Sequence, residues 1–147
     1  MNAAMNPVLL IEDNPNDVAL IQRAFRNARV ANPVRVLGDG EQPWPICEAQ
    51  MSSPTRSAHP LPIMLLDLTL PRTSGLEVLA WVRSQTDLKR LPVVVLTSSR
   101  QPADINRAYD PGANSYLVMP GDSASLVEMV KAVDLYWLIL NQQPSME

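Results

Sequence analysis

The chain has little cysteine, lysine and glycine, and it lacks any long hydrophobic run. Cys47 is the only cysteine among 147 residues, which excludes an internal disulfide bond and is compatible with a reducing compartment. The apolar stretch after the opening MNAAMNP covers only about five residues, too few for a membrane span or a secretion signal. We therefore expect a cytoplasmic protein that does not insert into a membrane.

The charged residues exclude a strongly basic protein. The formal net charge is -3 and the sequence pI is about 5.1. The ten arginines are scattered along the chain, and the two lysines are Lys89 and Lys131. Nucleic-acid binding needs lysines and arginines gathered on one face, so we expect no nucleic-acid partner. A hydrophobic content of 46% in a chain of this length fits one globular domain.

Short apolar segments alternate with longer segments of helical period. Helices are expected to begin after Asn14, at Gly75, at Pro102 and at Asp122, the last running to Asn141. Prolines predict a poorer helix over 39–51 and a loop over 52–62. The expected strands are Val8–Ile11, Val34–Leu37, Ile63–Leu66, Val93–Leu96 and Ser115–Val118.

This alternation predicts an α/β fold with a doubly wound, five-stranded parallel sheet. No internal repeat or linker divides the chain, so we expect residues 1–147 to form a single domain with no output domain. Ligands of such sheets bind beyond the carboxyl ends of the strands. A dinucleotide-binding domain is not expected, because no G-x-G-x-x-G pattern follows the first strand.

Carboxylates stand at two of these strand ends. Glu12 and Asp13 follow the first strand, Asp67 the third, and Thr97 the fourth. Two unit charges about 4 Å apart repel by about 4 kcal/mol at an effective dielectric near 20, so protons or a cation must relieve such a rim. Oxygen ligands without histidine or cysteine favour Mg²⁺. The simpler interpretation is that Glu12 and Asp13 only solvate a strand end and favour the next helix N-terminus, but Asp67 and Thr97 weigh against it.

Four separated segments, LLIEDNPND, LLDLTLPRTSG, VVVLTSS and NSYLVMPG, resemble the receiver domain of two-component response regulators. The resemblance covers nearly the whole chain and implies the CheY-like, flavodoxin-like (βα)5 fold. It implies that Asp67 accepts a phosphoryl group from a partner histidine kinase, and that Thr97 donates its hydroxyl to a phosphoryl oxygen while Tyr116 rotates inward. The implied Mg²⁺ ligands are Glu12, Asp13, Asp67 and the backbone carbonyl of Thr69.

One residue departs from the receiver pattern. Receivers of this pattern carry a lysine directly before the proline that follows strand five, where this chain has Met119. A thioether cannot supply a hydrogen bond from a charged group, which is worth roughly 1.5–3 kcal/mol. Lys89 and Lys131 lie too far along the chain to replace it, and Arg72 or Arg100 are candidates for partial compensation. We expect this departure to weaken the coupling between the phosphoryl group and loop movement more than the phosphoryl transfer itself.

The last helix carries more apolar residues than one buried face needs. Residues 135–140 are apolar without interruption, so some of them must be exposed as a patch of the kind that marks an interface. A twofold homodimer is the default use, and the alternative is a helix end that folds back over the domain. The stripe expected to face the core is Leu126, Val130, Val133, Trp137 and Leu140. The expected interface residues are Leu135, Tyr136, Trp137, Leu138 and Ile139.

The apolar last helix, the opening IEDNPNDV and the segments VLTSS and YDPGANSYL are similar to small response regulators paired with bacterial and cyanobacterial phytochromes. This second resemblance implies a light-regulated phytochrome histidine kinase as the partner. It also implies dimerisation through the face formed by helix four, strand five and helix five.

Three classes of function stay open from the sequence. The leading one is a phosphorylatable switch that is not an enzyme. The second is a pseudo-receiver that serves as a constitutive dimeric adaptor, which Met119 favours and the intact acids oppose. The third is a small Mg²⁺-dependent phosphohydrolase, for which the sequence offers no general acid; His59, the only histidine, lies in a proline-rich loop and is expected to be solvated.

Overall fold

The structure is a computed structural model that describes residues 6–38, 61–70 and 74–144. The predicted helix over 39–51 and all but the last two residues of the predicted loop lie outside these ranges. The elements are β1 (Val8–Ile11), α1 (Pro15–Asn27), β2 (Val34–Leu37), β3 (Met64–Leu66), α3 (Gly75–Ser84), β4 (Val93–Thr97), α4 (Pro102–Tyr109), β5 (Ser115–Val118), α5 (Ser123–Val133) and η1 (Asp134–Leu140).

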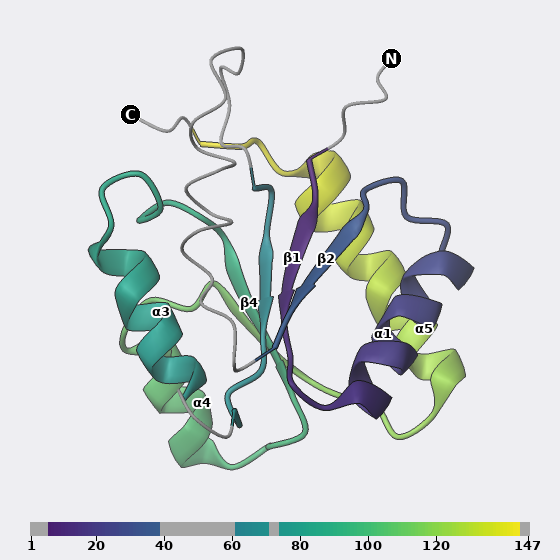
Figure 1. Ribbon diagram of the computed structural model, residues 1–147, viewed down its shortest axis with the longest axis horizontal. Helices are drawn as coiled ribbons and strands as arrows, with labels where there is room; N and C mark the ends of the chain where they lie inside the picture. The colour runs from purple at the N-terminus through teal and green to yellow at the C-terminus, as the bar shows by residue number, and fades with distance from the viewer. Residues whose placement is uncertain (1–5, 39–60, 71–73, 145–147) are drawn as a thin grey trace.

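The five strands form one sheet in the order β2-β1-β3-β4-β5, and every neighbouring pair is parallel. Strand β1 therefore lies between β2 and β3, with Leu10 paired to Val36 on one side and Leu65 on the other. The predicted doubly wound α/β fold is confirmed (Figure 1). Of the helices in the described residues, none combines the length and apolarity needed to cross a bilayer.

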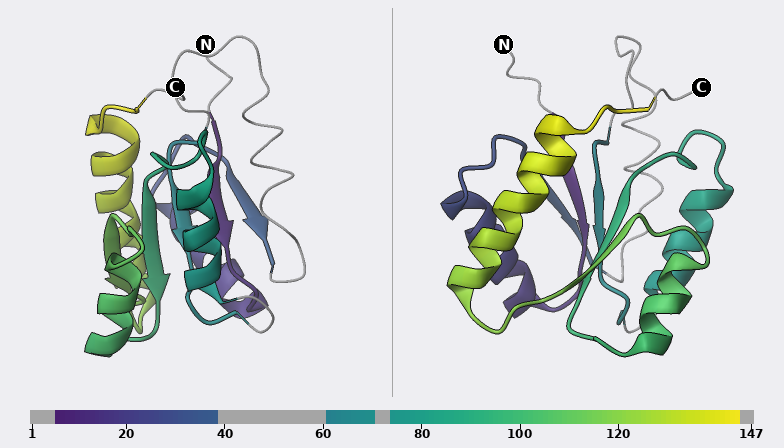
Figure 2. Two further views of the ribbon diagram at one scale, coloured as in Figure 1. Left: turned by 90° about the vertical axis from the view of Figure 1, so that its left-hand side faces the viewer. Right: turned by 180° about the vertical axis from the view of Figure 1, so that it is seen from behind.

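Helices cover both faces of the sheet, which explains why its central strands are apolar throughout. Successive side chains of β1 alternate between two core clusters. Leu9 and Ile11 pack with residues of α3 and α4, whereas Val8 and Leu10 pack with residues of α1 and α5. Figure 2 shows these two helical layers on opposite sides of the strands. All of β1, β3 and β4 is buried, so the centre of the sheet is a rigid platform for the residues at the strand ends.

Two helix starts fix the backbone beside the carboxyl ends of β1 and β3. Asn14 caps α1, because its side chain accepts hydrogen bonds from the backbone N–H groups of Asn16 (2.8 Å) and Asp17 (3.2 Å). At the start of α3, a Cβ on Gly75 would collide with the backbone carbonyl oxygen of Asp67. Only glycine allows this approach, which holds α3 against the segment that carries Asp67.

The last helix differs from the prediction of one α-helix over 122–141. An α-helix over Ser123–Val133 passes directly into the π-helix η1. Hydrogen bonds in η1 join residues five apart, as in the 2.7 Å bond from Asn141 N–H to the carbonyl of Tyr136. The wider turn of a π-helix changes the direction in which each later side chain points. A pattern based on α-helical spacing therefore fails beyond residue 133.

The predicted core-facing stripe shows this change. Leu126, Val130 and Val133 are buried as predicted, and Trp137 is partly buried against the same cluster. The prediction is wrong for Leu140, which is 60% exposed because it comes after a full turn of η1. The stripe that covers the α1 side of the sheet therefore ends at Trp137.

Candidate functional site

Side chains from four strand ends line one open cavity of about 500 Å³. The cavity lies beyond the carboxyl edge of the sheet, where a doubly wound fold binds its ligands. Of the residues predicted for the site, the structure brings Glu12, Asp13 and Asp67 together here, along with Thr69 and Met119. Asn14 and Asp17 of the α1 start also line it, as does Ser98, which follows Thr97 at the end of β4. Among the described residues, the lining is Glu12, Asp13, Asn14, Pro15, Asp17, Asp67, Thr69, Ser98 and Met119.

Glu12 is the most buried acid of the cavity, with 3% of its surface exposed. Its Oε2 accepts hydrogen bonds from the backbone N–H groups of Asp13 (3.1 Å) and Asn14 (3.2 Å). Burial raises the pKa of Glu12 to about 7, and the charge of Asp67 and a side-chain hydrogen bond with it contribute to the same rise. Without a cation, this acid therefore holds a proton over part of the neutral range.

Asp67 stands directly after β3 and stays within reach of solvent. Its backbone N–H donates to the carbonyl of Ile11 (3.1 Å), which continues the ladder between β1 and β3. Its Oδ1 accepts a hydrogen bond from the backbone N–H of Thr69 (3.3 Å). The side chain is half-buried, so one side is held by the protein and the other opens on the cavity. That placement suits a nucleophile that a partner protein must approach.

Thr97 ends β4 next to Asp67 but is buried, with 2% of its surface exposed. The register pairs Leu66 with Val95, so Thr97 lies one step beyond the level of Asp67. Its Oγ1 has no hydrogen-bond partner in the described part of the chain. A buried hydroxyl without a partner costs about 1–3 kcal/mol of folding free energy, so such groups usually bind a water or a ligand.

Met119 takes the place of the expected lysine and behaves as a hydrophobic residue. Its backbone N–H donates to the carbonyl of Thr97 (2.7 Å), and its side chain packs partly buried against the α1 and α5 core cluster. Among the described residues, those that line the cavity include no cationic side chain. Arg100 is exposed and is not part of this lining, and Arg72 lies outside the described residues.

Tyr116 lies on β5 and is connected to the loop after Thr97. Its hydroxyl donates to the backbone carbonyl of Ser99 (2.9 Å). The Ser99 hydroxyl in turn donates to Asp104 Oδ2 of α4 (2.5 Å). The sequence pointed to Tyr116 but not to Ser99 or Asp104. The run of three hydroxyl residues before α4 was the available signal for this network.

The donor set fits a hard divalent cation. All the available side-chain ligands are oxygens, and a cation would relieve the repulsion that contributes to the raised pKa of Glu12. Within residues 6–38, 61–70 and 74–144, no three acidic, histidine or cysteine side chains already stand in a metal-binding arrangement.

The raised pKa of Glu12 predicts a pH-dependent stability in metal-free buffer. Between pH 4.5 and about 7 the folded protein keeps a proton on Glu12 that the unfolded chain has released. This contribution to stability is fully present below pH 4.5 and is lost as the pH rises through 7. Relative to Glu12→Gln, the wild type should lose on the order of 2 kcal/mol of unfolding free energy from pH 5 to pH 8, measured by urea unfolding with EDTA.

Glu128→Gln is the matched control, because Glu128 is an exposed glutamate on α5 that pairs with Lys131. The unfolding free energy of Glu128→Gln should depend on pH as that of the wild type does. Mg²⁺ at pH 8 should raise the unfolding free energy of Glu128→Gln and of the wild type by the same amount. Equal pH profiles for wild type and Glu12→Gln would contradict the raised pKa of Glu12.

Comparisons with known proteins agree with this geometry. The family described as "Response regulator receiver domain" matches residues 8–131. Rcp1, a response regulator of the cyanobacterium Synechocystis, is 34% identical over 141 residues, which cover 94% of this chain and 95% of Rcp1. FilR2, a probable methanogenesis regulatory protein of Methanothrix harundinacea, is 36% identical over 138 residues, covering 93% of this chain and 86% of its own.

Solved structures show the same fold and two relevant chemical states. The phosphorylated cyanobacterial phytochrome response regulator RcpA superposes with a TM-score of 0.76 at 33% identity, over 96% of this chain and 99% of its own. The Mn²⁺-bound form of Rcp1 superposes with a TM-score of 0.75 at 31% identity, over 95% of this chain and 99% of its own. The chain therefore belongs to the receiver domains of two-component response regulators and is related to those of phytochrome systems.

Proposed function

We propose that this receiver domain accepts a phosphoryl group on Asp67 from a partner histidine kinase, with Mg²⁺ bound, and signals through protein contacts. The main support is the arrangement at the carboxyl edge of the sheet. A half-buried aspartate opens on the cavity beside a second acid, Glu12. Thr97 lies one register step further on the neighbouring strand, and its hydroxyl has no partner among the described residues. Because the phosphoryl group stays on the protein, we propose a switch and not an enzyme. We also propose that the protein is located in the cytoplasm.

The chemistry is determined by the positions of these groups. A carboxylate oxygen of Asp67 attacks the phosphorus of a phosphohistidine, the P–N bond breaks, and the imidazole nitrogen keeps the electron pair. Thr97 donates its free hydroxyl to an oxygen of the transferred group. Glu12, Asp13, Asp67 and the carbonyl of Thr69 would hold Mg²⁺, which neutralises charge on the phosphoryl oxygens when bound. Glu12 must release its proton to take part.

The partner kinase is proposed to be of the phytochrome type. Rcp1 and RcpA, which match nearly the full length of this chain, support this choice because RcpA is described as a phytochrome response regulator. FilR2 has a similar sequence identity to this chain but is described as a probable methanogenesis regulatory protein. Full-length similarity alone therefore does not identify the type of partner kinase. Phosphotransfer from purified phytochrome kinases and from other histidine kinases would distinguish the two cases.

A homodimer through the face of α4, β5 and α5 is proposed for the described domain. In η1, Leu135, Tyr136 and Ile139 are 53%, 56% and 62% exposed. Trp137 and Leu138 are partly buried against the core. The rings of Tyr136 and Trp137 pack edge to face, with their centroids 4.8 Å apart. The three exposed side chains therefore stand on a rigid support, and a second copy would bury them twice.

The competing proposal is a constitutive dimeric adaptor that does not use phosphate. Met119 favours it, because an apolar side chain packed on the core provides no cation for the phosphoryl group. The buried hydroxyl of Thr97 and the raised pKa of Glu12 oppose it, since both carry a free-energy cost that an adaptor would not need.

Acetyl phosphate with Mg²⁺ separates these two proposals. The wild type should gain one phosphoryl group by intact mass spectrometry, because acetyl phosphate needs no kinase. Asp67→Asn should gain none, whereas Asp110→Asn, an exposed aspartate after α4, should behave as the wild type. Wild-type protein that stays unmodified after long incubation would favour the adaptor, and labelling of Asp67→Asn would show that the acceptor is another residue.

The departure at Met119 gives a second test. Met119→Lys should raise the yield or the lifetime of phosphorylated protein by up to about tenfold, because an ammonium adds a charged hydrogen bond to the phosphoryl group. Met119→Leu keeps an apolar side chain of similar size and should change neither. Loss of label over time, followed by intact mass, is the measurement. Identical decay in all three proteins would mean that Met119 is a neutral substitution.

The dimer proposal predicts an effect limited to η1. Tyr136→Glu combined with Ile139→Glu should convert the dimer to a monomer in light scattering after gel filtration, because charge is placed in a buried interface. Leu20→Glu is the control, since Leu20 is 40% exposed on α1, away from this face. A wild type that is monomeric at high micromolar concentration, or a double variant that stays dimeric, would argue against this interface.

A further inference from the structure

A second hollow lies at the opposite end of α1 from the phosphoacceptor site. It has a volume of about 340 Å³ and lies between the last turns of α1 and the beginning of β2. Since α1 has 13 residues, its two ends are about 20 Å apart. We call it the α1–β2 pocket. Its lining is Gln22, Phe25, Arg26, Val30, Ala31, Asn32, Pro33 and Val34.

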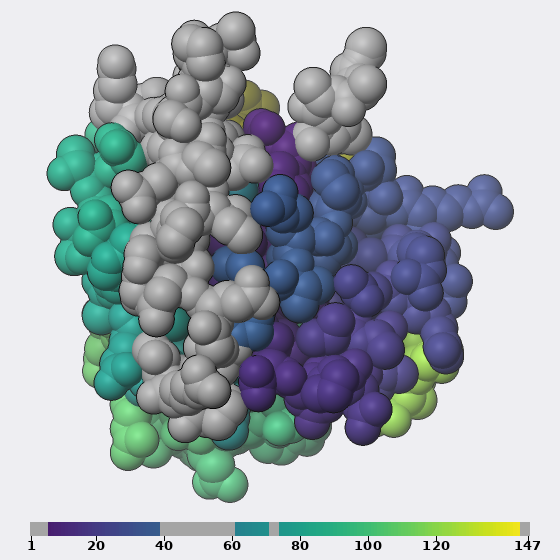
Figure 3. Space-filling view, in the orientation of Figure 1, coloured from purple at the N-terminus to yellow at the C-terminus, as the bar shows by residue number. Residues whose placement is uncertain are grey.

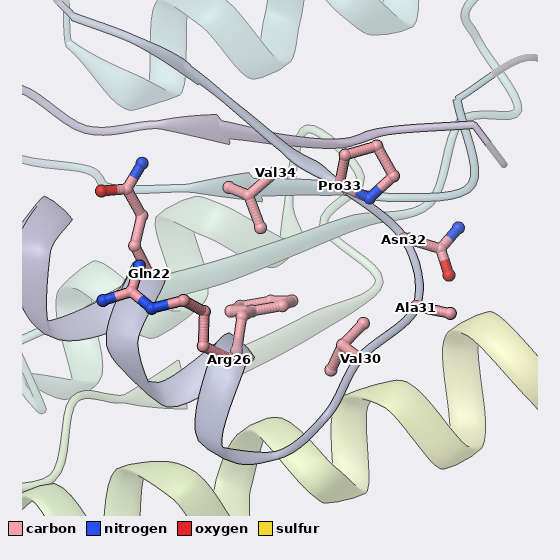
Figure 4. A pocket seen from close by; sticks show the side chains of 8 residues that line it. Gln22, Arg26, Val30, Ala31, Asn32, Pro33 and Val34 are labelled. Carbon is pink, nitrogen blue, oxygen red and sulfur yellow. The ribbon is translucent and has the colours of Figure 1, made fainter.

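The lining of the α1–β2 pocket mixes polar side chains with a few apolar ones that pack on the core. Phe25 is 4% exposed, and Val30 and Val34 pack against the core cluster of α1 and α5. The Asn32 side chain donates to the backbone carbonyl of Asn6 (2.9 Å), which ties the connecting loop to the segment before β1. Figure 4 shows Val34 facing the helix that carries Gln22 and Arg26. The pocket is therefore formed before any partner arrives.

The chain segment around the pocket is basic although the chain as a whole is acidic. Residues 18–38 contain four arginines and no aspartate or glutamate, whereas the net charge of the chain is -3. Arg26 lines the pocket, and Arg23 lies three residues before it on the same side of α1. Arg29 stands in the turn directly before the lining residue Val30. All three are exposed, and none forms an ion pair within the described ranges.

The fourth arginine belongs to the other face of the sheet. Arg35 alternates along β2 with Val34 and Val36, and both valines pack toward α1 and α5. The arginines that look scattered in the sequence thus include a local group of three. In Figure 3 the surfaces of α1 and β2, coloured purple to blue, form the right-hand side of the molecule.

The backbone at Arg29 gives a second, independent observation. Its φ of 58° lies in the left-handed region, where glycine is favoured. The turn closes α1 through hydrogen bonds from Arg29 N–H to the Arg26 carbonyl (3.0 Å) and from Val30 N–H to the Phe25 carbonyl (3.2 Å). A helix end attracts basic side chains in its last turn, which accounts for Arg26. It accounts neither for an arginine in place of glycine nor for Arg23 in the helix interior.

We propose that the α1–β2 pocket docks an acidic peptide segment of a partner protein. An apolar side chain of the segment lies over the half-buried Val30 and Val34, and flanking carboxylates pair with Arg26 and the neighbouring Arg23 and Arg29. The size decides against nucleic acid, because about 340 Å³ holds one or two side chains while nucleic acid needs basic contacts along a stripe. This surface goes beyond phosphoryl transfer and is spatially separate from Asp67.

Fluorescence anisotropy with a defined probe tests the proposal. The probe is a fluorescein-labelled pentapeptide of two glutamates, one leucine and two glutamates, and the matched probe has glutamines in place of the glutamates. The acidic probe should bind the full chain, more weakly at higher salt, and the neutral probe should not. Arg26→Gln combined with Arg29→Gln should weaken binding by about fivefold or more.

The matched control removes the same charge elsewhere. Arg100→Gln combined with Arg107→Gln alters two exposed arginines, of which Arg107 stands in the last turn of α4 as Arg26 does in α1. This control should leave the affinity unchanged within about twofold. Equal weakening in both double variants would mean that only the net charge matters, and would overturn the proposal.

Two further variants keep the result interpretable. Arg29→Gly removes one charge but relieves the left-handed backbone, so binding should weaken about two- to threefold while the midpoint of thermal unfolding stays equal or rises. Asp67→Asn should bind the probe as the wild type does, which separates this surface from the phosphoacceptor. Absence of acidic-probe binding, equal binding of the neutral probe, or tighter binding of a single-stranded oligonucleotide of equal charge would each overturn the proposal.

Discussion

The burial of Glu12 beside the charge of Asp67 is the constraint around which the carboxyl edge of this domain is organised. Strands β1 and β3 are hydrogen-bonded neighbours, so the residues directly after them are forced into proximity. The bond from Asp67 N–H to the Ile11 carbonyl and the close approach of Gly75 hold Asp67 in place. Relief must therefore come from a proton or a cation, and not from movement of the backbone.

That constraint also explains why a rigid backbone holds two polar groups, at Glu12 and Thr97, whose interactions are not satisfied within the described residues. The apolar strands and capped helices supply the rigid frame, and the frame leaves a raised pKa at Glu12 and an unpaired hydroxyl at Thr97. Both defects carry a free-energy cost in the isolated domain. A ligand that brings positive charge and oxygen acceptors would remove both at once, which is what a divalent cation and a phosphoryl group offer together.

The sequence predicted the strands and the meeting of the acids because both depend on local patterns. Parallel strands buried on both faces are apolar throughout, and their carboxyl ends must share one edge. The errors arise where local patterns do not decide. The change to a π-helix after Val133 left Leu140 exposed, and nothing in the apolar run over 135–140 signals it. The contact of Tyr116 with Ser99 joins residues 17 positions apart, so spacing alone could not reveal it.

Charge distribution along α1 was missed for a related reason. A count of arginines over the whole chain hides the fact that Asp17 begins this helix while Arg23 and Arg26 occupy its later turns. The order matches the helix dipole, so the same sequence both stabilises α1 and separates an acidic end from a basic end. One short helix thus has the proposed cation site at its start and the proposed docking pocket for an acidic peptide at its end. Because both ends are fixed to the sheet by caps and core packing, a partner at either end meets a preformed surface.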